Sequence, residues 1–83
     1  MKQEDENPQN PGSFEGRYAN AFQVGHSAFE FLLDFGQVSS ESEQVQFHTR
    51  IITGPVYAKA LLATLQESIE RYEQHFGPIP QSS

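Results

Sequence analysis

Three histidines and two carboxylates are the side chains of this sequence with the clearest potential for metal or acid–base chemistry. His26, His48 and His75 fall in a predicted turn, a predicted strand and a predicted helix end, so no two have metal-ligand spacing. Glu30 and Asp34 share one face of a predicted strand, about 13 Å apart at ~3.3 Å per residue. That separation is too long for a cooperating carboxylate pair. We therefore expect these residues to have structural or surface roles.

A small enzyme built on Asp34, His48 and Arg50 is the strongest catalytic alternative. These residues could converge on one face of a sheet, but no nucleophile with its own base and orienting group accompanies them. The glycines form neither a G-x-G-x-x-G nor a GxxxxGK[ST] phosphate loop and fit turns instead. We predict no catalytic residues, no cofactor and no metal, and hence no enzyme.

The composition of the chain limits the classes of partner that it is expected to bind. Its 83 residues carry a net charge of −6 and five Lys and Arg in total. Binding to nucleic acid or to an anionic membrane needs clustered positive charge, so neither is expected. The sequence has no cysteine, no stretch that resembles a signal peptide and no long apolar run, so we expect a cytoplasmic protein.

Three stretches alternate apolar and polar residues with the period of a strand. They are Arg17–Val24, Phe29–Phe35 and Gln44–Thr53. The second stretch is the most apolar, because Phe29, Phe31, Leu33 and Phe35 share one face. Gly25-His26 suits a two-residue hairpin turn. The polar stretch Val38–Gln44 is a loop. The sequence therefore predicts a three-stranded antiparallel meander.

The predicted turns also fix a register. A turn at Gly25-His26 places Phe22 opposite Phe29, which brings the apolar strips of the first two strands side by side. If the third strand pairs with the second so that Phe35 lies near Val45, Glu30 comes close to Arg50 on the other face. An exposed cross-strand ion pair of this kind is weak.

A helix follows the third predicted strand. Pro55 suits the first helical position, and Gly77-Pro78 is a typical helix stop. Between them an apolar stripe recurs at helical spacing and includes Ala58, Leu62, Leu65, Ile69, Tyr72 and Phe76. We expect this stripe to cover one face of the sheet, although the same spacing admits helix pairing between chains. The fold class is therefore α+β, with order β-β-β-α and one long C-terminal helix packed on one face.

The chain divides into three parts. Residues 1–16 are acidic, amide-rich and poor in large apolar side chains, so we expect a disordered segment. Residues 17–77 form the single β-β-β-α domain, and residues 78–83 form a flexible tail.

Several strings of the sequence resemble one family. They are ANAFQVG at 19–25, EFLLDFG at 30–36, HTRI at 48–51, Pro55 with Ala58-Lys59, Tyr72-Glu73 and Phe76-Gly77. In order and spacing they resemble the small prokaryotic proteins of the DUF3467 family, over about residues 17–77. The family has no established activity, so the resemblance implies no reaction. Strands followed by a long helix are also similar in architecture to SecB-type export chaperones, by analogy of fold alone.

The short ordered chain and its two open sheet edges predict self-association. We expect a homodimer or higher homo-oligomer, with a protein or peptide as the further candidate partner. The predicted interface lies on the second face of the sheet and comprises Ala19, Ala21, Leu32, Ile52, Glu30 and Arg50. The leading hypothesis is a non-catalytic interaction or oligomerisation module. The alternative is a SecB-like holdase for unfolded polypeptide, and a small enzyme is the least favoured.

Overall fold

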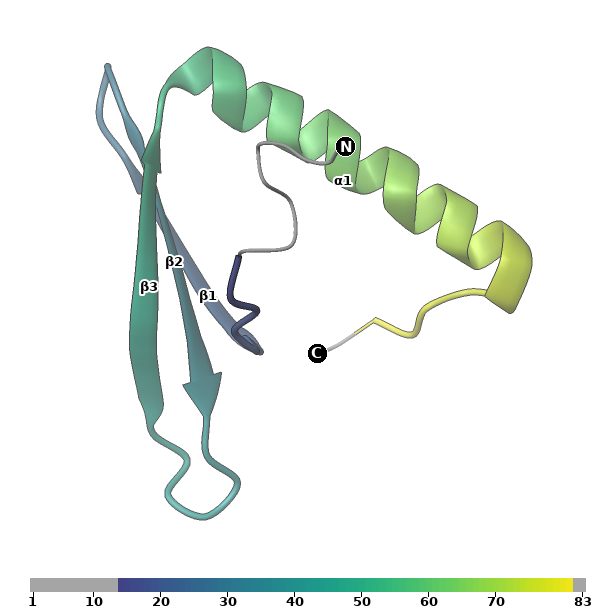
Figure 1. Ribbon diagram of the computed structural model, residues 1–83, viewed down its shortest axis with the longest axis horizontal. Coiled ribbons are helices and arrows are strands. Elements are labelled where there is room, and N and C mark those ends of the chain that lie inside the picture. Colours follow the sequence, from purple (N-terminus) through teal and green to yellow (C-terminus); the bar gives the residue numbers. More distant parts are fainter. Residues whose placement is uncertain (1–13, 82–83) are drawn as a thin grey trace.

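The computed structural model describes residues 14–81 and contains three strands followed by one helix (Figure 1). The elements are β1 (Ala21–His26), β2 (Phe31–Val38), β3 (Val45–Thr53) and α1 (Pro55–Phe76). The strands form one antiparallel sheet in the order β1-β2-β3. The α+β class and the β-β-β-α order are as predicted. The predictions made for residues 1–13 and 82–83 lie outside the described residues.

The β1–β2 turn lies later in the chain than predicted. Ser27 N–H donates to Glu30 O at 2.9 Å, and Ser27 Oγ accepts the N–H groups of Phe29 and Glu30 at 3.2 Å. Gly25 belongs to β1 and does not have a positive φ, whereas the predicted two-residue turn needs one at that position. The predicted turn is therefore wrong, because the serine hydroxyl closes a longer turn that needs no special glycine conformation.

The displaced turn changes the register of β1 on β2 but keeps the faces. Phe22 pairs with Phe35 rather than with Phe29, and Val24 pairs with Leu33. Because the displacement is an even number of residues, the apolar strips of both strands still share one face. The rings of Phe22 and Phe35 meet edge to face with centroids 5.9 Å apart.

The β2–β3 pairing contains a bulge that the sequence analysis missed. Asp34, rather than Glu30, pairs with Arg50, and the register shifts between Phe35 and Gly36. Gly36 is buried against the bulged part of β3, where an added Cβ would lie 2.8 Å from Phe47 Cα. Glycine is therefore required at this close approach of two backbones.

The ends of α1 are as predicted, since both are set by local signals. Pro55 is the first helical residue, and Gly77 ends the helix with a φ of 94°. The Gly77 N–H donates to Glu73 O at 2.9 Å, and the Glu73 carboxylate accepts the N–H of Ile79 at 2.8 Å. These bonds satisfy backbone groups at the end of the helix.

The predicted packing of the helix on its own sheet is wrong. In Figure 1, α1 leaves the end of β3 and runs away from the strands. No residue of α1 is buried, and no hydrophobic side chain among residues 14–81 is buried. Only Gly54 separates Thr53, the end of β3, from Pro55, the start of α1. So short a connection leaves no room for the reversal that would lay the helix along its own strands.

Candidate interaction surface

One face of the sheet is mainly apolar and extends over all three strands, although His26, Thr49 and Thr53 also lie on it. The register places six of its side chains together, and we call them the aromatic face: Phe22, Val24, Phe31, Leu33, Phe35 and Ile51. The strand residues on this side include no Asp, Glu, Lys or Arg. Phe22 is 66% exposed, and none of the six is buried. A contiguous patch of six uncovered apolar side chains is typical of a surface that contacts another protein.

The helix carries a second uncovered apolar surface. Six of its residues, which we call the helix stripe, line one side at helical spacing: Leu61, Leu62, Leu65, Ile69, Tyr72 and Phe76. Their exposed fractions run from 39% at Ile69 to 75% at Phe76. The rings of Tyr72 and Phe76 lie tilted against each other with centroids 4.9 Å apart, so the far end of the stripe is aromatic.

The second face of the sheet has a polar centre built from all three strands. Arg50 Nε donates to Asp34 Oδ1 at 2.7 Å and Arg50 Nη2 to Oδ2 at 2.9 Å, while Gln23 Nε2 also donates to Oδ2 at 2.9 Å. Asp34 is only 6% exposed. These hydrogen bonds, with that of Arg50 the largest, lower the pKa of Asp34 to about 2, and the same bond raises the pKa of Arg50.

The structure brings together four of the six residues predicted for an interface. Ala21, Leu32, Arg50 and Ile52 lie on the second face, where Leu32 pairs directly with Ile52. Glu30 lies in the β1–β2 turn, beyond the last strand pair, and so does not face Arg50.

Ala19, the sixth residue, precedes β1. It borders a shallow hollow that is also lined by Phe35 and Thr49 of the other side of the sheet. Sequence reasoning missed the partner of Arg50, because β2 continues to Val38, which pairs with Val45 in place of Phe35, and because the bulge shifts the register by one more residue. The buried Gly36 was the available signal.

The three residues of the enzyme alternative border one shallow hollow of about 370 Å³, where their side chains are engaged in hydrogen bonds with other groups of the chain. Asp34 is bound to Arg50 and Gln23. The His48 ring donates from Nε2 to Tyr18 O at 3.0 Å, which leaves Nδ1 to accept the Thr49 hydroxyl at 2.7 Å. Both ring nitrogens are therefore engaged. Among residues 14–81, no three His, Asp or Glu side chains gather as a metal site.

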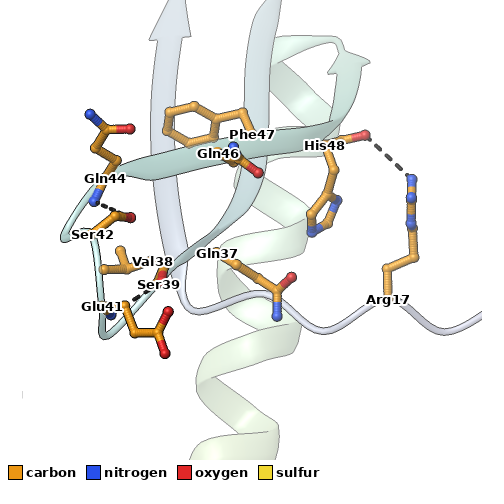
Figure 2. A pocket seen from close by; sticks show the side chains of 10 residues that line it. All are labelled: Arg17, Gln37, Val38, Ser39, Glu41, Ser42, Gln44, Gln46, Phe47 and His48. Carbon is orange, nitrogen blue, oxygen red and sulfur yellow. Dashed lines mark hydrogen bonds between the residues drawn. The ribbon is translucent and has the colours of Figure 1, made fainter.

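A hollow at the end of the β2–β3 hairpin has a volume of about 750 Å³ (Figure 2). Arg17 Nη1 donates to His48 O at its border, at 3.4 Å. Its lining is mixed: Arg17, Gln37, Val38, Ser39, Glu41, Ser42, Gln44, Gln46, Phe47 and His48. In Figure 2 these side chains surround an open space and do not converge on one point.

The fold and its surfaces define a small α+β protein of β-β-β-α order whose main feature is uncovered apolar surface. The chain belongs to the DUF3467 family, described as a protein of unknown function, whose model matches residues 2–81. Comparison with curated proteins and with solved structures gave no significant match. In the part of the chain that the structure describes, no helix has the length and hydropathy to cross a membrane.

Proposed function

We propose that the protein is a non-catalytic interaction module that works as a homo-oligomer. One observation carries the proposal: residues 14–81 bury no hydrophobic side chain, yet they present an aromatic face and a helix stripe. Apolar burial is the main term that offsets the conformational entropy of folding. A single chain in this arrangement lacks that term, and a second chain would supply it.

The free energies of apolar burial and of backbone ordering support the same conclusion. Covering one exposed Leu, Ile or Phe side chain contributes about 1.5–3 kcal/mol. Ordering one residue of backbone costs about 1–2 kcal/mol, so a sheet and helix of this size need many such side chains covered. The aromatic face and the helix stripe are the largest reserves of uncovered apolar surface in the described chain. Association through them is therefore the most direct route to a stable fold.

The partner is expected to be protein rather than nucleic acid or lipid. The net charge of −6 would repel phosphate backbones and anionic headgroups. The absence of cysteine fits a cytoplasmic setting for this module.

Sedimentation velocity of the full chain from nanomolar to high micromolar concentration tests the proposal. We expect a dimer or larger assembly at micromolar concentration, with circular dichroism that contains both strand and helix signals. A folded monomer over the whole range would contradict it.

A SecB-like holdase is the second candidate, because the uncovered aromatic face and the open edges of β1 and β3 could bind an extended polypeptide. The test is suppression of aggregation of an unfolding client protein at equimolar chain. Binding to the unfolded client, and none to its folded form, would favour the holdase. Assembly without client binding would favour the simple interaction module. A small enzyme is the least supported function, since both nitrogens of His48 are already bonded.

A further inference from the structure

The junction between sheet and helix holds the two apolar surfaces of one chain apart. Gly54 is the only residue between β3 and α1, and its backbone is extended, with φ −85° and ψ 163°. Connections from strand to helix typically need two to six residues to fold the helix back along the sheet. Pro55 fixes φ at the first helical position and removes further freedom. The helix stripe therefore projects beyond the sheet of its own chain, as Figure 1 shows for α1.

The same two surfaces match each other in length and chemistry. The 22 residues of α1 extend about 33 Å at 1.5 Å per residue. The nine residues of β3 extend about 30 Å at ~3.3 Å per residue. The aromatic face lacks Asp, Glu, Lys and Arg, whereas the second face has Asp34 and Arg50 at its centre. An apolar helix stripe thus fits the aromatic face better than the second face.

The area available is sufficient for a stable dimer. A fully exposed aromatic side chain offers about 150–250 Å². With the exposed fractions of 39–75% along the helix stripe and 66% at Phe22, the two surfaces together offer on the order of 1,000 Å² per copy. A standard protein–protein interface needs about 800 Å² per partner.

We propose that two copies of the chain exchange their helices. The helix stripe of each copy lies on the aromatic face of the other, and a twofold axis relates the two contacts. This inference rests on the proposed function, because it names the partner as a second copy and the contact as helix on sheet. A twofold exchange covers both surfaces of both chains at once and closes the assembly. Short connections between elements favour such exchange over closure within one chain.

The absence of cysteine allows a direct test. One chain carries Leu33→Cys on the aromatic face, and a second chain with a larger tag carries Leu65→Cys on the helix stripe. The two are mixed in denaturant, refolded together and oxidised. We expect the main disulfide product to join one small and one large chain. The matched control replaces Leu65→Cys by Ala63→Cys, an exposed position on the opposite side of α1, and should give little of that product.

Each alternative arrangement has its own result. Disulfide products that join only two small chains or only two large chains would overturn the helix exchange while leaving the homo-oligomer intact. A disulfide within one chain that carries both Leu33→Cys and Leu65→Cys would show closure on its own sheet and would also overturn the exchange. A monomer in sedimentation would overturn the proposed function itself.

A second test uses the wild-type chain, so its result does not depend on any substitution. In an equal mixture of isotope-labelled and unlabelled chains, filtered NMR spectra should show contacts between chains that join Leu65 or Ile69 to Leu33 or Phe35. A folded dimer whose contacts between chains omit all of these pairs would overturn the exchange.

Discussion

Asp34 and Arg50 stand directly opposite each other on β2 and β3, and Arg50 Nε lies 2.7 Å from Asp34 Oδ1. Gln23 of β1 donates to the same carboxylate at 2.9 Å. One side chain of the central strand therefore links both neighbours, on the side of the sheet opposite the aromatic face. Slippage of either outer strand would break a charge-assisted or polar hydrogen bond, so this cluster fixes the register.

The first prediction concerns acid stability. The pKa of Asp34 is lowered from 3.8 to about 2 by its hydrogen bonds, so its ionised form is favoured in the folded state. Its contribution to stability is present above pH 3.8 and is lost as the pH falls through about 2. Asp34→Asn lacks this contribution. We expect the gap in urea midpoint between wild type and Asp34→Asn to be largest near pH 6 and to shrink from pH 4 to pH 2.

Glu30→Gln is the matched control for that experiment, since it makes the same carboxylate-to-amide change in the β1–β2 turn. Its urea midpoint should stay close to that of wild type at every pH. A gap between wild type and Asp34→Asn that is constant from pH 6 to pH 2 would contradict the role given to the ionised Asp34.

The second prediction concerns the bulge. A methyl group at Gly36 would lie 2.8 Å from Phe47 Cα and would also meet Gln46 O, and neither is a flexible side-chain end. Gly36→Ala should therefore cost about 1–3 kcal/mol of stability, the usual range for overpacking. In the control Gly25→Ala, the added Cβ has no atom within 4 Å, so this variant should lose much less stability than Gly36→Ala. Equal urea midpoints for the two variants would show that β3 moves aside without cost.

The sequence was most informative where a structural signal is local. Pro55 and Gly77 set both ends of α1, because a missing N–H and a positive φ act within one turn of the chain. The β1–β2 turn was less readable, since Gly25 and Ser27 both offer turn chemistry two residues apart. Glu30 was assigned to Arg50 in place of Asp34 for a different reason: Val38, not Phe35, pairs with Val45, and the bulge, which has no periodic signature, shifts the register by one more residue. The spacing of apolar residues also predicts which face of an element must be covered. It does not indicate whether the covering element belongs to the same chain or to another.

The third prediction concerns the second face, which the helix exchange leaves uncovered. Leu32 and Ile52 pair there, beside the polar centre. If two exchanged dimers meet through this patch, Leu32→Glu or Ile52→Glu should return the larger assembly to a dimer with the fold retained. A charge buried without a partner costs several kcal/mol. Ala63→Glu adds the same charge on the side of α1 away from the helix stripe and should leave the mass unaltered. Sedimentation velocity measures the assembly mass of the two second-face variants and of the control. Masses equal to that of wild type for both Leu32→Glu and Ile52→Glu would exclude a contact at Leu32 and Ile52.

The last prediction joins folding to association. If the cover of each aromatic face comes from a second chain, unfolding releases two chains, and stability depends on total protein concentration. A tenfold increase stabilises a dimer against its unfolded chains by about 1.4 kcal/mol. For a pair of chains of this size, that corresponds to a rise in melting temperature of about 3–6 °C.

Thermal unfolding followed by circular dichroism at three concentrations, each tenfold apart, measures this dependence. Ala63→Glu changes the side of α1 away from the helix stripe and should keep the wild-type slope. Leu65→Glu places a charge in the middle of the stripe, where Leu65 is 53% exposed in one chain and becomes covered only by a second. It should unfold at a lower temperature at every concentration. A wild-type melting temperature that does not change over the hundredfold range would mean that a single chain supplies its own core, and association through the helix stripe would then be wrong.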